Sequence, residues 1–194
     1  MRGSINFNSL HTRSFAVLYM LLASTLCRAQ SLAVKNDALY DALLIPNLGM
    51  EVRAGKHTTV DVEGTYDPVS FSSERKWKNW SLCPEVRFWC CHPFSGMFVG
   101  INALCGGFNV SRMNVFGLKE KRAQCRLFYG GGLTLGNHYV ISPCWGLEAK
   151  ANVGFVHIPY SRYRCGTCGY KEKNVTANYI GPTNISITLI YIIK

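Results

Sequence analysis

Alternation of apolar and polar residues is the feature that most constrains the fold of this chain. Residues 185–193 place an apolar side chain at every second position, with Ser186 and Thr188 between them. Because successive side chains of a strand point to opposite faces, this pattern predicts a strand with one apolar face. After the first 29 residues, no apolar stretch approaches the roughly 18 residues that a transmembrane helix needs. The chain is therefore expected to be built from strands.

The same period of two recurs along the chain. Seven further segments show it, at residues 32–43, 48–54, 59–66, 80–88, 97–105, 126–135 and 139–158. Short turns are expected at 55–57, 90–95 and 136–138, and long connections near 67–78, 106–124 and 159–178. This alternation of short and long connections is typical of outer-membrane barrels, and only the connection at 45–47 is unexpectedly short. We therefore predict an all-β fold, an eight-stranded antiparallel up-and-down transmembrane β-barrel.

Composition and charge agree with a barrel that has an apolar outside and a polar inside. The chain is 48% hydrophobic and only 16% charged, and its mean hydropathy of +0.05 is the average expected of two opposite faces. The charged residues of the predicted inward face are Glu51, Arg53, Asp61, Glu63, Glu85, Arg87, Arg126, Glu148 and Lys150. The interior of an eight-stranded barrel is just wide enough for side chains, so opposite charges are expected to pair there and fill it. The alternative is that these inward charges form a ring that selects a conducted ion.

The first 29 residues have the features of a signal peptide. Arg2 and Arg13 precede an apolar run, and Ala29 offers a small residue for cleavage. Cys27 allows a lipoprotein reading, but Leu26 is larger than the small residue that a lipobox needs before its cysteine. We expect residues 1–29 to be a signal peptide and residues 30–194 to be the barrel domain, exported to the outer membrane. Cleavage would leave 18 basic and 11 acidic residues, a net charge of +7.

The most chemical motif is Cys165-Gly-Thr-Cys168. In an oxidising compartment this pair is a candidate disulfide that stiffens an extracellular loop. A zinc ribbon needs a second cysteine pair, and a thioredoxin-type site needs alternating strands and helices, which the chain lacks. We expect no cofactor and no metal site, although redox or metal chemistry at these two cysteines remains an alternative.

Basic residues gather in the predicted extracellular loops. They number 11 of the 18 that would remain after cleavage, and they are Arg75, Lys76, Lys78, Arg112, Lys119, Lys121, Arg122, Arg162, Arg164, Lys171 and Lys173. Such residues could simply be solvated. Their functional reading is contact with lipopolysaccharide phosphates or with an acidic surface protein. Nucleic acid is not expected as a partner, because an exported chain rarely meets it.

Aromatic residues and enzyme motifs also favour a non-enzymatic barrel. Trp77, Trp80, Trp89 and Trp145 are predicted to belong to the aromatic girdles at the membrane interfaces. Known catalytic elbows, zinc-protease motifs and phosphate-binding loops are missing from the sequence. The histidines His57, His92 and His138 are expected at turns on the periplasmic side, far from an outer catalytic site. We therefore expect no enzymatic activity.

Several sequence blocks carry a family resemblance. They are residues 36–52, 66–71, 76–80, 84–90, 128–132 and 165–169, and Gly181-Pro-Thr before the last apolar strand. Over nearly all of residues 30–194 the chain resembles an uncharacterised domain-of-unknown-function family of Bacteroidota outer-membrane proteins. The resemblance implies a small barrel, often encoded near fimbrial components, with a role in the assembly or anchoring of surface structures or in envelope integrity. It brings no active site.

The sequence thus predicts a non-enzymatic outer-membrane barrel that contacts lipid, lipopolysaccharide or a fimbrial or other surface protein through basic loops. A soluble ligand-binding barrel like a lipocalin is one alternative, and it would need an apolar interior. A redox or metal protein that uses Cys165 and Cys168 is the other.

Overall fold

Eight antiparallel strands form one sheet that closes on itself. The computed structural model describes residues 32–67, 77–111, 122–163 and 171–193. The strands are β1 (Leu32–Asp37), β2 (Asn47–Arg53), β3 (Thr58–Asp67), β4 (Trp77–Trp89), β5 (Gly96–Ser111), β6 (Arg122–Val140), β7 (Trp145–Tyr163) and β8 (Lys171–Ile193). Each strand pairs with the next in sequence, and β1 also pairs with β8, which closes the barrel. The predicted all-β, up-and-down arrangement of eight strands is confirmed.

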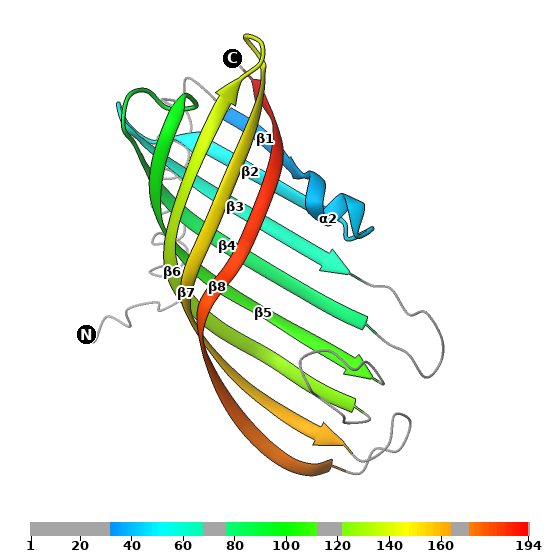
Figure 1. Cartoon of the computed structure of the whole chain (residues 1–194). Helices are drawn as coiled ribbons and strands as arrows, with labels where there is room; N and C mark the ends of the chain where they lie inside the picture. The colour runs from blue at the N-terminus through cyan, green and yellow to red at the C-terminus, as the bar shows by residue number, and fades with distance from the viewer. Residues whose placement is uncertain (1–31, 68–76, 112–121, 164–170, 194) are drawn as a thin grey trace, which may run out of the picture.

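The strands lengthen steadily from the N-terminal to the C-terminal side of the barrel. The first, β1, has 6 residues and the last, β8, has 23. The connections at 54–57, 90–95 and 141–144 define what we call the turn end, at the top of Figure 1. The opposite end, called the loop end, is where the connections at 68–76, 112–121 and 164–170 begin and finish. The wall is therefore low at β1 and β2 and high at β7 and β8 (Figure 1).

The alternation of polar and apolar residues in the sequence corresponds to the inner and outer faces of the barrel. Along β3, Thr59 and Asp61 are fully buried, whereas Val60 and Val62 face out and are 41% and 38% exposed. The paired register carries the same division to the neighbouring strand, because Asp61 lies opposite Glu85 of β4. Polar residues thus line the lumen and apolar residues cover the outer wall.

Residues 38–43, predicted as part of a first extended run, are not a strand. They include the short helix α2 (Ala38–Ala42). Asp37 caps this helix, since its carboxylate accepts a hydrogen bond from the Leu39 amide at 2.9 Å. The helix follows the end of β1, at the right of Figure 1. It is the only helix in the described part of the chain, and none there is long and apolar enough to cross a membrane.

The turn predicted at 136–138 is also wrong, because β6 continues to Val140 and the turn lies at 141–144. Gly136 suggests a turn in the sequence, but its lack of a side chain serves packing instead. A Cβ at this position would collide with the ring of Phe98 inside the barrel. As a consequence β7 begins at Trp145 rather than at Tyr139. The long connections are shorter than predicted, because the strands extend further toward the loop end.

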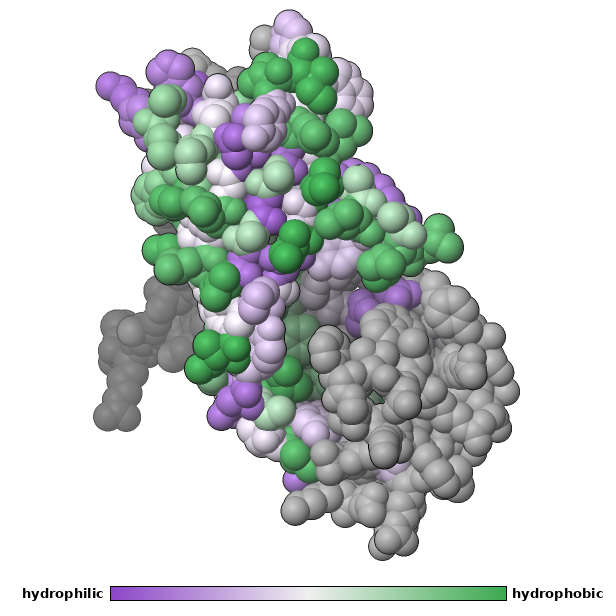
Figure 2. All heavy atoms as spheres, viewed as in Figure 1, coloured by the Kyte–Doolittle hydropathy of each residue, from purple (hydrophilic) through white to green (hydrophobic). Residues whose placement is uncertain are grey.

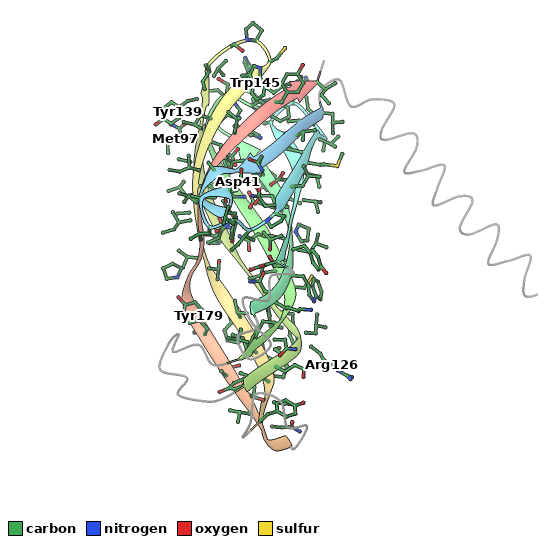
Figure 3. The ribbon with its side chains drawn as sticks, turned by 90° about the vertical axis from the view of Figure 1, so that its right-hand side faces the viewer. Asp41, Met97, Arg126, Tyr139, Trp145 and Tyr179 are labelled. Carbon is green, nitrogen blue, oxygen red and sulfur yellow. The ribbon has the colours of Figure 1, made fainter. Side chains whose placement is uncertain are left out.

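One predicted inward residue points outward. Arg126 is exposed, and so is the next residue, Leu127. The pairing of β6 shifts register on both sides here, between Gly106 and Phe108 of β5 and between Gln124 and Tyr129 of β6. Such a bulge inserts a residue and breaks the strict alternation of faces. Figure 3 shows Arg126 directed away from the ribbon near the loop end.

Candidate functional site

The lumen near the turn end contains an ion-pair network centred on Arg87 of β4. This side chain is fully buried. It contacts carboxylates from four strands: Glu51 Oε2 at 3.0 Å, Asp61 Oδ2 at 2.8 Å, Glu85 Oε1 at 2.6 Å and Glu148 Oε2 at 2.9 Å. Charge-assisted bonds of this length are the strong ones among protein hydrogen bonds. A single guanidinium therefore ties β2, β3, β4 and β7 together across the lumen.

Two lysines complete the network. Lys35 of β1 contacts Glu51, and its Nζ lies 3.2 Å from Glu148 Oε2. Lys150 of β7 lies nearer the loop end, with Nζ 2.5 Å from Glu63 Oε1. Lys35 and Lys150 are only 1% and 4% exposed, so both ammonium groups depend on these carboxylates for their stability.

Neutral side chains extend the network in two directions. Toward the turn end, the indole Nε1 of Trp89 donates to Thr59 Oγ1 at 2.8 Å, and the Thr59 hydroxyl donates to Glu51. On the other side, the Thr134 hydroxyl donates to Glu85 Oε2 at 2.8 Å. The buried carboxylates are thus held by hydroxyl groups as well as by cations.

The network carries more negative than positive groups. Within the described residues it joins five carboxylates, Glu51, Asp61, Glu63, Glu85 and Glu148, to three cations, Lys35, Arg87 and Lys150. Its formal charge is −2 when every group is ionised. Because an uncompensated charge is costly inside a protein, a carboxyl group in such a network is either neutralised by a proton or balanced by a cation.

Aromatic side chains pack against the network on its turn-end side. The ring centroids of Trp89 and Phe98 are 4.8 Å apart, and the Arg87 guanidinium carbon lies 4.6 Å from the Phe98 centroid. Phe94 comes from the β4–β5 turn at the turn end of the barrel, where it packs in a buried cluster with Ala33. Its φ of +63° is unusual for a non-glycine residue, so packing must hold it there. These contacts form a plug at the turn end.

A small polar chamber lies on the other side of the network. Its volume is about 40 Å³, and its lining includes Tyr40, Glu63, Thr65, Ser81, Cys83, Asn102, Asn152 and Asn184. Tyr40 enters from α2, and its hydroxyl donates to Asn184 Oδ1 at 3.4 Å. Burial raises the pKa of Tyr40 to about 12, so this hydroxyl stays protonated and neutral.

The α2 connection is fastened to the barrel wall by Asn47. Its Oδ1 accepts from the Asp37 amide at 2.6 Å, and its Nδ2 donates to the Asp37 carbonyl at 3.1 Å. The same Nδ2 lies 2.9 Å from Asp41 Oδ1 on the helix. These bonds fix the position from which Tyr40 reaches the chamber.

The outer wall is apolar across its middle. Ile101, Leu133 and Ile185 are 61%, 66% and 65% exposed on three different strands. Figure 2 shows green apolar side chains spread over the visible outer face, and in Figure 3 the labelled Met97 and Tyr139 lie on the outside of the ribbon. An exposed apolar surface of this extent is typical of a region that contacts another protein or a lipid phase.

Aromatic residues border this apolar surface at two levels. Toward the turn end, the rings of Trp145 and Tyr191 lie on the outside with centroids 4.9 Å apart. Toward the loop end, Trp80, Tyr129 and Tyr179 are exposed. Trp89 was predicted to belong to a girdle, and this is wrong: it is 3% exposed and faces the lumen, where its indole N–H finds a hydroxyl acceptor.

The structure describes fewer than half of the eleven residues predicted to contact lipopolysaccharide or a partner. Six lie outside the described residues: Arg75, Lys76, Arg112, Lys119, Lys121 and Arg164. The other five were expected in loops but belong to the loop-end parts of strands: Lys78, Arg122, Arg162, Lys171 and Lys173. The strands extend through these polar positions because backbone pairing with neighbouring strands continues there. Of these five, Lys78 has an exposed side chain.

The cysteine predictions have a similar outcome. Cys165 and Cys168 lie outside the described residues, so their pairing stays a prediction. None of the six cysteines in the described ranges forms a disulfide. Within those ranges, no group of three or more His, Cys, Asp and Glu side chains converges to hold a metal ion.

Sequence reasoning missed several members of the lumen. Lys35 belongs to the alternating pattern of the first strand, and its position between two buried residues, Ala33 and Asp37, could have indicated it. His138 was placed in a turn, but it is 2% exposed and packs edge-on against Trp89. Tyr40 carries no signal of this kind, because only the fold of the α2 connection brings it to the chamber.

Comparisons with known proteins identify a family but not an activity. A family model described as "Protein of unknown function (DUF3575)" matches residues 15–193. No curated protein and no solved structure is significantly similar to the chain.

Proposed function

The chain belongs to the DUF3575 family, and on that premise we propose that it is a non-enzymatic, membrane-spanning β-barrel of the outer membrane with a filled lumen. The observation that carries this proposal is the distribution of side chains across the sheet. Ionised residues such as Arg87 and Glu148 are fully buried inside, whereas Leu133 and Ile101 are more than half exposed outside. A barrel in water would need the reverse arrangement, but a barrel in lipid needs this one.

Strand length supports the same proposal. A strand crosses the hydrocarbon core of a bilayer with about 9–11 residues when it is tilted. The strands from β4 to β8 have 13 to 23 residues, so they exceed this requirement. Since the turn end is compact, the surplus extends on the loop-end side, beyond the aromatic level of Trp80 and Tyr129. The loop end would therefore project from the membrane surface.

The filled lumen supports a structural role rather than conduction. The Arg87 network spans the interior, and the Trp89 and Phe98 rings lie against its turn-end side. A conducted ion would have to pass both layers. We therefore propose that the barrel anchors or supports a surface structure instead of forming an open channel.

The charge of the loop end supports an acidic partner. Residues 75–78, 112–122 and 162–173 contain all eleven basic residues predicted as contacts, against two acidic ones, Glu120 and Glu172. A polar hollow of about 540 Å³ lies between the loop-end parts of β6, β7 and β8, and Arg126 is among its lining residues. We propose that this end contacts the phosphates of lipopolysaccharide, and that it can also present the barrel to a fimbrial or other surface protein.

The two alternative functions, a soluble ligand-binding barrel and a redox or metal protein, are less well supported. A lipocalin-like barrel stores its ligand in an apolar lumen, and the described lumen is ionic at its centre. A redox or metal function at Cys165 and Cys168 has no support from the described residues, because the two cysteines lie outside them.

Membrane placement is tested by fractionation of producing cells. The envelope fraction is run on a detergent gel with and without boiling, and an intact barrel is expected to migrate differently from the unfolded chain. A protein that stays in the soluble periplasmic fraction and shows no heat-dependent shift would contradict the proposal.

The acidic-lipid contact is tested by a charge variant. Replacement of Arg112, Lys119, Lys121 and Arg122 by glutamine should reduce the lipopolysaccharide that copurifies with the barrel in mild detergent. The matched control replaces Arg53 and Lys56 at the turn end and should leave the bound amount unchanged. Equal lipopolysaccharide on all three proteins would rule out the loop end as the binding surface.

A further inference from the structure

The ion-pair network of the lumen contains more carboxylates than cations. The network holds five carboxylates but three cations, and four of those carboxylates are at most 2% exposed. The remaining carboxylate, Glu63, is 18% exposed and is also the one that lines the polar chamber. Glu63 is therefore the carboxyl group of the network that a ligand in the chamber can reach.

The chamber offers a second and independent sign of a ligand. Asn152 is 2% exposed and lines the chamber, and its Oδ1 is buried without a hydrogen-bond partner among the described residues. A buried acceptor of this kind is costly unless something donates to it or coordinates it. Since Oδ1 is an acceptor, its missing partner is a hydrogen-bond donor or a cation.

We propose that the chamber binds a hard metal cation, for which Ca²⁺ is the representative, through Glu63 and Asn152. The proposal deepens the proposed function and rests on it, because a lumen closed to bulk water is what makes an unpartnered Asn152 oxygen costly. Ca²⁺ binds carboxylate oxygens, amide oxygens and water in flexible geometry. Glu63 uses Oε1 to accept from Lys150 Nζ at 2.5 Å, and its second oxygen, Oε2, is the one assigned to the cation.

Neighbouring groups fit a cation of this class. The Thr65 and Ser81 hydroxyl oxygens lie 2.6 Å from each other in the chamber wall, so either can turn a lone pair inward. A volume of about 40 Å³ is enough for one ion with little water. A softer metal such as zinc would need several histidine or cysteine ligands, and no such cluster converges within the described ranges. Because a single carboxylate takes part, the affinity should fall in the weak, millimolar range of extracellular calcium modules.

Terbium luminescence gives a direct readout. Tb³⁺ replaces Ca²⁺ at oxygen sites, and Tyr40 lines the chamber and can transfer excitation to it. The full-length chain, folded in detergent micelles, is titrated with Tb³⁺ under tyrosine excitation, and Ca²⁺ is then added. The expected result is a saturable Tb³⁺ emission that Ca²⁺ displaces. Emission that does not saturate, or that Ca²⁺ leaves unchanged, would overturn the proposal.

Two carboxylate variants separate the chamber from the network as a whole. Glu63→Gln and Glu85→Gln each remove one negative charge, but Glu63 lines the chamber and Glu85 does not. Glu63→Gln should weaken Tb³⁺ binding about tenfold or more, since even loss of an outer-shell partner typically costs that much, and Glu85→Gln should weaken it much less. Equal losses in the two variants would mean that the chamber is not the site.

Variants of Asn152 keep the test informative if Glu63→Gln does not fold. Asn152→Asp adds a charged ligand and should tighten Tb³⁺ binding, whereas Asn152→Leu removes the oxygen at similar volume and should weaken it. No change in either variant would contradict the assignment. The heat-dependent gel shift is measured on the same samples, so an intact barrel without saturable binding would refute the cation site and leave the proposed function standing.

Discussion

The two halves of the lumen differ in what their side chains achieve. In the half near the turn end, charged groups form a dense ion-pair network and aromatic rings pack against it, as with Arg87 and Phe98. In the half near the loop end, the wall carries neutral polar groups such as Thr65 and Asn152, and a chamber remains between them. One half of the lumen is therefore filled by a network that joins several strands, while the other leaves a small polar chamber.

The half of the lumen near the turn end stabilises the barrel mainly because removal of one member of its ion-pair network is costly. Replacement of a whole buried ion pair by apolar residues is often neutral, but removal of one partner leaves an unpaired charge. Arg87 is the extreme case, since several carboxylates depend on it at once. The predictions below follow from this asymmetry, in order of decreasing effect.

The largest effect is expected from Arg87→Met. The variant leaves buried carboxylates such as Asp61 without their closest cation, and the free energy of unfolding should fall by about 3–5 kcal/mol. Urea unfolding of the barrel in lipid vesicles measures this. The control is Arg126→Met on the exposed bulge, which should change the unfolding free energy by about 0.5 kcal/mol or less. A loss below about 1 kcal/mol for Arg87→Met would mean that the network does not hold the turn-end half together.

A charge on the outer wall comes next. Leu133→Arg places a guanidinium at the middle of the exposed apolar surface and should cost about 2–4 kcal/mol in a bilayer. Tyr139→Arg, at the aromatic level near the turn end, is the control and should cost about 0–1 kcal/mol. The same urea titration in vesicles compares them. If both variants unfold like the unmodified protein, the outer wall does not face lipid.

A matched pair of threonines on β3 tests the comparison within a single strand. Thr59 is fully buried between Trp89 and Glu51, and Thr65 contacts Ser81 in the chamber wall. Thr59→Val leaves two buried polar groups without a partner and should cost about 1–3 kcal/mol. Thr65→Val should cost clearly less, because the chamber can supply water to Ser81. A larger loss for Thr65→Val would reverse the assignment of the two halves.

The smallest effect is expected at the α2 connection. Asn47→Ala removes the amide that joins Asp37 and Asp41, and the unfolding free energy should fall by about 1 kcal/mol, since this region is partly solvated. Asn137→Ala on the outward face of β6 serves as the control. Hydrogen exchange should show faster exchange in residues 38–43 of the Asn47 variant. Unchanged exchange there would mean that Asn47 does not fasten the helix.

The period of two predicted most of the residues that line the lumen, because every second residue of a strand lies on the same face of the sheet. Glu51, Asp61, Arg87, Glu148 and Lys150 were all predicted to point inward, and each is buried. The prediction failed where the alternation itself breaks.

The failures have identifiable physical causes. A bulge in β6 turns Arg126 outward, and Gly136 makes room for Phe98 rather than a turn, so His138 moves into the lumen. The chamber could not be predicted at all, because it requires α2 to bring Tyr40 against β8, a contact between residues 144 positions apart. The disulfide at Cys165 and Cys168 stays a prediction.

Quenching by brominated lipids tests the central claim most directly, namely that the apolar face lies in lipid and the polar face in a sealed lumen. Two variants are prepared in which Trp145 or Trp89 is the only tryptophan, and each is folded into vesicles with and without brominated acyl chains. Trp145 is 44% exposed on the outer wall and should be strongly quenched, whereas Trp89 is 3% exposed and should keep most of its emission. Equal quenching of the two, or an unquenched Trp145, would contradict the account.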